Sequence, residues 1–286
     1  MGRDGVLQLQ NILLRESIEQ VKATIGPELD RITVERAVLG LFFTGIKLSD
    51  GHGGLCFTPV KEIPQAVCCP SSARAMPLSG RLSGRPVREY LADLDSDNIL
   101  RKTLGIAALN ALSASCWDRR PPRDYAIAIG KDSFNELELP EGGKTVVVGA
   151  LVPMLKKLIK ANADFHVLEM DASTLKPAEM PYYAPAQDAP KYVPGADLLV
   201  ITGVTILNDT LPGLLEMAKP GAQILVTGPT ASMLPDAFFK RGVGLMGGIL
   251  VTKPDELLDI ISEGGSGYHF FGKSAERLVV RRAANR

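Results

Sequence analysis

Thr145-Val146-Val147-Val148-Gly149 decides the fold of the C-terminal half of this 286-residue chain. The run is largely apolar and β-branched, which is typical of a strand buried on both faces of a sheet. Ile201-Thr202-Gly203 and Val226-Thr227-Gly228 have the same form, a strand followed at once by glycine. Strand-like and helix-like runs alternate around them, which predicts βαβ units, right-handed crossovers and a parallel sheet.

The alternation continues to the end of the chain. It predicts strands at 145–148, 165–169, 198–202, 223–227 and 278–280, and helices at 152–161, 234–240 and 254–262, with another helix ending at 219. The glycine-rich stretch 243–251 is expected to contain a further strand. We therefore predict an α/β fold for residues 125–286, a Rossmann-like parallel sheet with helices on both faces.

The N-terminal part has a different pattern. Residues 6–25 have the apolar spacing of an amphipathic helix, and β-rich stretches at 32–39, 41–48 and 55–58 accompany a glycine-rich turn at 49–54. Two helical segments follow, and the apolar face of the second contains small residues that permit close packing on a sheet. These features predict a small α+β domain over residues 1–120. The charged, proline-containing stretch 119–124 is the expected boundary.

The composition is that of an ordinary globular protein. Hydrophobic residues make up 45% and charged residues 22% of the chain, and 32 basic residues balance 32 acidic ones. A net charge of zero gives no electrostatic reason to expect binding to nucleic acid or to a membrane surface. It also leaves little repulsion between copies, so a homodimer is compatible with the sequence. No apolar run is long enough for a membrane helix, and we expect a cytoplasmic protein.

Three glycines mark the expected ligand site. Gly149, Gly203 and Gly228 each follow a strand, and the carboxyl ends of parallel strands meet at one edge of a sheet. Glycine lets backbone amides approach a ligand, and an adjacent helix N-terminus favours an anionic group. The alternative is that the glycines only make tight turns. Three of them on one edge favour a ligand site where the strand order reverses.

The loop at 149–154 lacks the second and third glycines of the dinucleotide fingerprint GxGxxG, which disfavours a conventional NAD enzyme. Glu169 ends the second strand, where an acidic residue often binds a ribose diol; otherwise it is a solvated acid beside Asp171. The stretch 171–195 contains five prolines. It is expected to form either a lid or wall of the site or an ordered surface segment.

Metal-binding residues are few. His52 lies at the glycine-rich turn with Cys56 four residues later, and Cys68 and Cys69 follow. Thiolate and imidazole suit soft metals, but this spacing has no recognised specificity, and buried thiols that pack as small apolar groups are the alternative. His166 lies within a predicted strand, where a structural role is expected. The sequence has no P-loop, HExxH or Ser/His/Asp motif.

The ordered set of motifs resembles a family of heavy-metal chelation proteins, which pair a domain like the capping domain of enolase with a Rossmann-like domain. The matching stretches are 53–55, 80–84, 105–111, 144–149, 196–203 with Asn208, 227–230, 244–248 and 263–265. The resemblance implies a site between the two domains. Its C-terminal side would be formed by Gly149, Thr202, Gly203, Asn208, Gly228, Pro229 and Thr230, and its N-terminal side by Thr58 and Asn110.

Three functions are compatible with these features. In the first, the protein binds a small anionic or nucleotide-like ligand, or a metal chelate, in an interdomain cleft, and makes, modifies or binds a metal chelator. In the second, it is a transferase that uses a nucleoside cofactor such as S-adenosylmethionine, with Glu169 on the ribose. In the third, it is a non-catalytic metal-binding protein that uses Cys56, Cys68 and Cys69. The sequence specifies neither a reaction nor the identity of a metal or cofactor.

Overall fold

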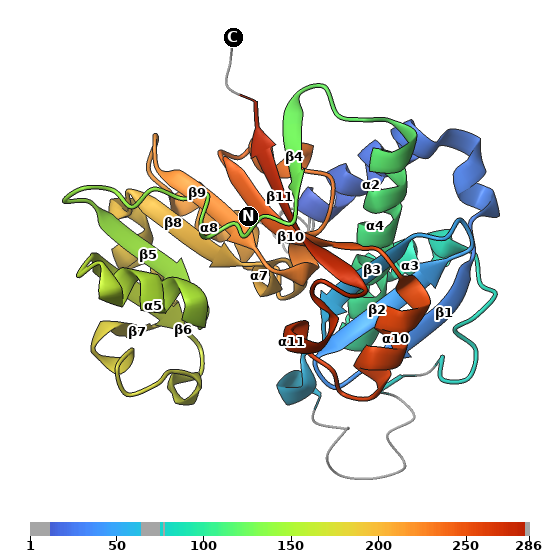
Figure 1. Cartoon of the computed structure of the whole chain (residues 1–286), viewed down its shortest axis with the longest axis horizontal. Coiled ribbons are helices and arrows are strands. Elements are labelled where there is room, and N and C mark those ends of the chain that lie inside the picture. Colours follow the sequence, from blue (N-terminus) through green and yellow to red (C-terminus); the bar gives the residue numbers. More distant parts are fainter. Residues whose placement is uncertain (1–11, 64–74, 77, 284–286) are drawn as a thin grey trace, which may run out of the picture.

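The computed structural model describes residues 12–63, 75–76 and 78–283, arranged as a three-stranded and an eight-stranded sheet with helices around both (Figure 1). The strands of the small sheet are β1 (Val34–Leu39), β2 (Phe43–Leu48) and β3 (Gly53–Phe57). Those of the large sheet are β4 (Tyr125–Ile129), β5 (Lys144–Val148), β6 (Asp164–Glu169), β7 (Tyr183–Pro185), β8 (Leu198–Thr202), β9 (Gln223–Thr227), β10 (Leu245–Val251) and β11 (Ala275–Arg282).

The α-helices are α2 (Ile12–Ile25), α3 (Val87–Ala92), α4 (Ile99–Arg119), α5 (Val152–Lys160), α6 (Ala189–Tyr192), α7 (Val204–Leu207), α8 (Leu211–Met217), α9 (Asp236–Phe239), α10 (Pro254–Ser262) and α11 (Gly267–Phe270). Short 3₁₀ helices connect them: η1 (Gly26–Arg31), η2 (Val60–Glu62), η5 (Asp93–Asp95), η6 (Ala172–Thr174), η7 (Met180–Tyr182), η8 (Ala186–Asp188), η9 (Val193–Gly195) and η10 (Pro229–Ala231). None of the helices in the described part of the chain has the length and apolarity needed to cross a membrane.

The large sheet confirms the predicted α/β fold. Its strand order is β4-β11-β10-β9-β8-β5-β6-β7, and every neighbouring pair from β10 to β7 is parallel. The chain leaves β5 toward β6 and β7 on one side and returns to β8, β9 and β10 on the other. The strand order therefore reverses between β5 and β8, which is where such folds bind ligands.

Alternate residues of the central strands face two separate cores. Val147, Val200 and Leu225 pack with Leu155 and Leu158 of α5 on one face. On the other face, alternate strand residues join a core that also contains residues of α7, α8 and α9 and, without interruption, residues of α2 and α4 in the N-terminal domain. Because this core is continuous, helices α2 and α4 share hydrophobic packing with the large sheet as well as polar contacts.

The small antiparallel sheet is covered on both faces. Helix α4 packs on one face, where a Cβ on Gly54 would lie 2.2 Å from the carbonyl oxygen of Ala107, so only glycine permits this approach. Helix α10, from the C-terminal half of the chain, packs beside β1 and β2 (Figure 1). Arg36 and Lys47 form ion pairs with Asp255 of α10. A segment distant in sequence thus completes the N-terminal domain.

The structure differs from the predicted pattern at the edges of the large sheet. β4 and β11 pair antiparallel, so the sheet is mainly rather than wholly parallel. The proline-rich stretch 171–195 contributes the edge strand β7, with short helices on either side. The first helix begins, within the described residues, at Ile12, and the earlier part of the prediction lies outside them. The likeness to the capping domain of enolase remains a prediction.

Candidate functional site

The N-terminal domain meets the carboxyl edge of the large sheet through the segment 57–61. At one end, the amide of Phe57 donates a hydrogen bond to Thr230 Oγ1, 3.1 Å away, just after β9. At the other, Lys61 Nζ lies 2.7 Å from the Asp171 carboxylate, just after β6. β8 and β5 lie between β9 and β6, a span of about 14 Å that five residues and a lysine side chain can bridge. The segment therefore runs opposite the ends of β8 and β5.

A buried joint fixes the β9 end of this segment. Asn110 of α4, 2% exposed, donates through Nδ2 to the carbonyl oxygens of Leu55, Pro229 and Thr230, at 2.7, 3.2 and 3.1 Å. Its Oδ1 is buried and has no hydrogen-bond partner among the described residues. Thr58 is 4% exposed, and its hydroxyl lies 2.9 Å from that of Thr44. Two residues expected from opposite sides of the site, Asn110 and Thr230, are thus brought together.

Gly149 and Thr202 lie side by side at the point where the strand order reverses. Gly149 has φ +95°, a conformation that favours glycine, and a Cβ there would lie 2.7 Å from Thr202 Cγ2. Both residues are partly exposed, and the Thr202 hydroxyl accepts only a long contact of 3.4 Å from the amide of Val204. This hydroxyl is therefore available to a ligand at the edge.

Glu169 holds the loop after β5. Its carboxylate accepts hydrogen bonds from the amide of Ala150 at 2.8 Å, of Met170 at 2.8 Å and of Asp171 at 3.3 Å. A ribose diol would have to compete with these backbone donors for the same oxygens. Glu169 therefore binds backbone amides of the neighbouring loops, whereas the sequence suggested that it binds the ribose of a nucleoside.

Gly203 and Asn208 serve the turn that follows β8. Gly203 is buried, and its amide donates to the carbonyl oxygen of Thr227 at 2.7 Å. Asn208 Oδ1 accepts the hydroxyl of Thr210 at 2.7 Å. The next residue, Asp209, forms a largely buried ion pair with Lys102 of α4. The turn therefore provides a second polar contact between the domains.

A pocket of about 220 Å³ opens beside the joint, on the sheet face covered by α5. Gly228 and Pro229, both expected site residues, line it, and Leu151 and Pro153 at the start of α5 form another wall. The other lining residues are Lys131, Asp132, Ser133, Phe134, Thr227, Gly247, Gly248, Ile249, Phe271, Arg277 and Leu278. The sequence reasoning missed these residues, although the Gly247-Gly248 pair within a predicted strand was a usable sign of close backbone approach.

Among the described residues, the cysteine and histidine side chains form no cluster at this edge. Cys56 is fully buried, and burial raises the pKa of its thiol to about 12, which opposes the thiolate form that binds metals. Cys68 and Cys69 lie outside the described residues. Within the described ranges, no three His, Cys, Asp or Glu side chains are grouped so as to hold a metal ion. His166 stacks against Tyr192 with ring centroids 4.3 Å apart.

His52 belongs to a polar cluster at the β2–β3 turn. Its Nδ1 lies 3.2 Å from the Asp50 carboxylate, whose other oxygen accepts the hydroxyl of Ser115 at 2.6 Å. The contact with Asp50 raises the pKa of His52. Burial opposes ionisation of Asp50, but the hydrogen bonds from His52 and Ser115 outweigh it and lower the pKa of Asp50 to about 2.

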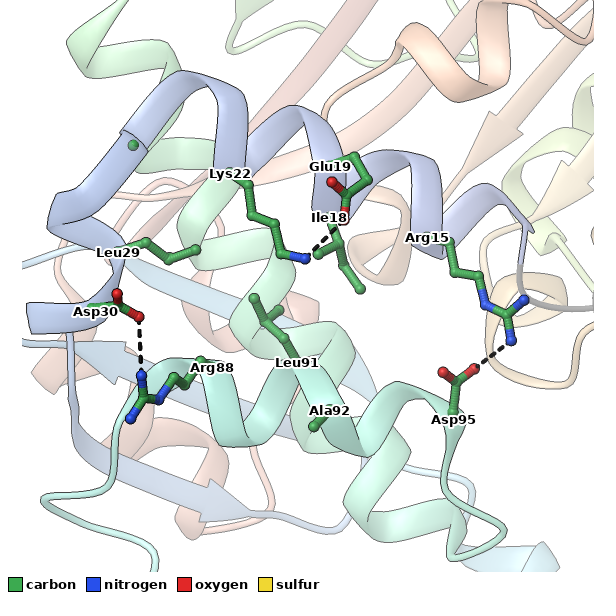
Figure 2. Close-up of a pocket in the computed structure, with 11 residues that line it drawn as sticks. Arg15, Ile18, Glu19, Lys22, Leu29, Asp30, Arg88, Leu91, Ala92 and Asp95 are labelled. Atoms are coloured by element: carbon green, nitrogen blue, oxygen red, sulfur yellow. Dashed lines mark hydrogen bonds and ion pairs between the residues drawn. The ribbon is translucent and has the colours of Figure 1, made fainter.

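A larger hollow, about 570 Å³, lies on the N-terminal domain between α2 and α3 (Figure 2). Ion pairs stand at its two ends, Asp30 with Arg88 and Arg15 with Asp95. All four side chains are well exposed, so these pairs contribute little to stability. No residue expected at the ligand site lines this hollow, and we assign it no role in binding.

Comparison with known proteins agrees with the fold and gives a family. A family profile described as "Putative heavy-metal chelation" matches residues 132–280, and a second profile with the same description matches residues 22–113. An uncharacterised protein of Methanocaldococcus jannaschii is 30% identical over 192 residues, which cover 66% of this chain and 69% of that protein.

Two crystal structures of DUF364 family proteins of unknown function are similar to the whole chain. That from Pyrococcus horikoshii has a TM-score of 0.73 at 19% identity, covering 96% of this chain and 99% of that one. That from Desulfitobacterium hafniense has a TM-score of 0.66 at 21% identity, covering 94% and 99%. At such identities the likeness shows the fold alone. The profile that matches residues 132–280, more than half of the chain, shows that the protein belongs to the DUF364 family, which is described as "Putative heavy-metal chelation".

Proposed function

We propose that this protein binds a small organic ligand between its two domains, at the carboxyl edge of the large sheet, and that the ligand is a metal chelator or its metal complex. The observation that carries the proposal is the segment 57–61, which forms a hydrogen bond after β9 and an exposed ion pair after β6 and so runs opposite the ends of β5 and β8. A parallel sheet of this type binds ligands at that reversal of strand order.

The chemistry of the edge supports an organic ligand. The Thr202 hydroxyl is partly exposed, and Gly149 brings backbone close to it. Asn110 Oδ1 adds a buried acceptor at the joint. Hydroxyl and amide groups hydrogen-bond to oxygen- and nitrogen-rich molecules, whereas soft metals prefer thiolate and imidazole. The metal would therefore reach the protein already held by its chelator. The family description supports the link to metal.

Native mass spectrometry of the freshly purified full chain tests this proposal. We expect a fraction of the protein to retain a non-covalent mass of small-molecule size, with or without a metal. Thr202→Leu should remove that mass, because the larger side chain fills the edge beside Gly149. Thr252→Leu is the matched control, since Thr252 is exposed and is not among the residues described at the site. Wild-type protein without any retained mass, or an equal mass in Thr202→Leu, contradicts the proposal.

A further inference from the structure

The 220 Å³ pocket beside the joint is lined by two basic side chains and one acidic side chain. Lys131 is exposed and Arg277 half-exposed at its lining, and the acidic residue there, Asp132, is already engaged. One Asp132 oxygen accepts the amide of Phe134 at 3.0 Å, and the other lies 3.4 Å from Arg277 Nε. The formal charge of these three side chains sums to +1. The start of α5, at Leu151 and Pro153, forms part of the same wall, and the Glu169 carboxylate already accepts the Ala150 amide just before it.

The floor of the pocket offers hydroxyl donors. Ser133 Oγ and Thr227 Oγ1 are 2.9 Å apart, and both residues are buried. Only one of their two hydroxyl protons can lie between the two oxygens, so the other can be donated to a ligand. Gly247 makes this floor possible, because a Cβ there would lie 2.4 Å from each hydroxyl oxygen.

Two parts of the lining, Arg277 and the turn that carries Ser133, are held in place by other contacts. The Arg277 guanidinium lies over the ring of Phe271, 4.5 Å from its centroid. Lys157 of α5 donates to the carbonyl oxygens of Phe134 and Leu137, at 2.5 and 3.0 Å, and so fixes the turn that carries Ser133. Groups that are already held in position bind an anion without first losing conformational freedom, so less binding free energy is lost.

We propose that this pocket binds the oxyanion group, carboxylate or phosphate, of a small molecule. Its volume is below the roughly 300–1,000 Å³ of sites for drug-sized ligands, so the occupant is a small metabolite or one end of a larger one. The inference rests on the proposed function, since the pocket shares the loops after β5 and β9 with the proposed site. It goes further by naming the chemical group that is recognised and Lys131 and Arg277 as the residues that recognise it.

Isothermal titration calorimetry of the full chain with two probes, citrate and inorganic phosphate, tests this proposal and separates the two oxyanions. We expect at least one probe to bind, and Lys131→Gln and Arg277→Gln each to raise its dissociation constant about tenfold or more, as for a lost hydrogen bond to a charged group. Thr227→Val should raise it a few fold. Lys160→Gln and Arg123→Gln are matched controls, because both residues are exposed and outside the lining.

Two results would overturn the oxyanion pocket: no binding of either probe at millimolar concentration, or equal binding by wild type and Lys131→Gln. Lys131 is exposed, so its replacement leaves folding intact and keeps the test decisive. The proposed function is tested by a different experiment, so the two proposals can fail independently. If a retained mass is lost in Thr202→Leu while neither probe binds, only the oxyanion pocket is wrong. If a probe binds through Lys131 but no mass is retained, only the proposed function is wrong.

Discussion

Replacing Asn110 by alanine should loosen the joint between the two domains. The Nδ2 group lies within 3.2 Å of three carbonyl oxygens, but it has only two hydrogens, so it makes at most two full hydrogen bonds. Removing the donor leaves buried carbonyl groups without this hydrogen-bond partner. Each of the two lost bonds should lower the free energy of unfolding by about 1–2 kcal/mol. We therefore expect Asn110→Ala to lower the free energy of unfolding by about 3 kcal/mol.

Urea denaturation followed by tryptophan fluorescence measures this change. The single tryptophan, Trp117 of α4, donates from Nε1 to the hydroxyl of Tyr125 in β4 at 2.9 Å, so it reports on contact between the domains. With a denaturant dependence of about 3 kcal/mol per molar urea, the midpoint should fall by about 1 M. Asn135→Ala, at an exposed position, is the control and should change the free energy by less than about 0.5 kcal/mol.

A second variant checks the direction of the Asn110 hydrogen bonds. Asn110→Asp at neutral pH places a carboxylate against three carbonyl oxygens, and we expect it to destabilise the protein more than Asn110→Ala does. The reasoning is refuted if Asn110→Ala shifts the midpoint by less than about 0.3 M, or if Asn110→Asp is as stable as the wild type.

Three further predictions concern other parts of the structure. Gly247→Ala should destabilise the protein and weaken oxyanion binding, because its Cβ would lie 2.4 Å from two hydroxyl oxygens. Gly244→Ala is the control, since its Cβ would meet nothing closer than 4.0 Å. Urea denaturation midpoints compare the two variants, and equal effects would contradict the close packing at Gly247. The contact with Asp50 raises the pKa of His52 in the folded protein. The pair therefore stabilises the protein fully when the pH is below the pKa of His52 in the unfolded chain, about 6.5. This stabilisation is lost as the pH rises through the pKa of His52 in the folded protein. His52→Gln should therefore lose more stability relative to wild type at pH 5.5 than at pH 9, and a pH-independent loss would contradict this. Cys56 should resist a thiol reagent at pH 8 until the protein unfolds, because burial raises its pKa to about 12. Peptide mapping after treatment checks this prediction, and modification of Cys56 in the native protein would disprove it.

Local sequence patterns were sufficient to predict the central strands. β5, β8 and β9 are buried on both faces and carry the apolar β-branched runs expected there. Because glycine follows each strand, the sequence also predicted a ligand site at this edge, and that site stays a prediction. The final strand was also predicted, but the antiparallel pairing of β4 with β11 was not, since it joins residues that are about 150 positions apart, such as Ile129 and Leu278.

The candidate site was only partly predictable for a similar reason. Gly149 and Gly228 follow strands and Thr202 ends one, so topology alone brings them to one edge. Lys131 and Arg277 reach the pocket that Gly228 lines from the first and last strands of the large sheet, and no local pattern joins them. The role of Glu169 was also hidden, because acceptance of the Ala150 amide depends on the three-dimensional course of the loop rather than on its sequence.

The same limit applies to the N-terminal domain. Its meander and long helix follow from local patterns, but the covering of its sheet by α10 depends on contacts such as Arg36 with Asp259, which are 223 residues apart. The prediction of two consecutive domains therefore described the order of the elements along the chain. It did not anticipate that a C-terminal helix packs on the N-terminal sheet.

Hydrogen exchange tests the location of the ligand most directly. Freshly purified protein would be compared with the same protein stripped of small molecules by unfolding, dialysis and refolding. We predict faster exchange after stripping in residues 57–61, 149–152 and 202–205, which surround the reversal of strand order, and unchanged exchange in α10 on the far side of the small sheet. Equal exchange in all three segments, or a change confined to other parts of the chain, would contradict a ligand site at this edge.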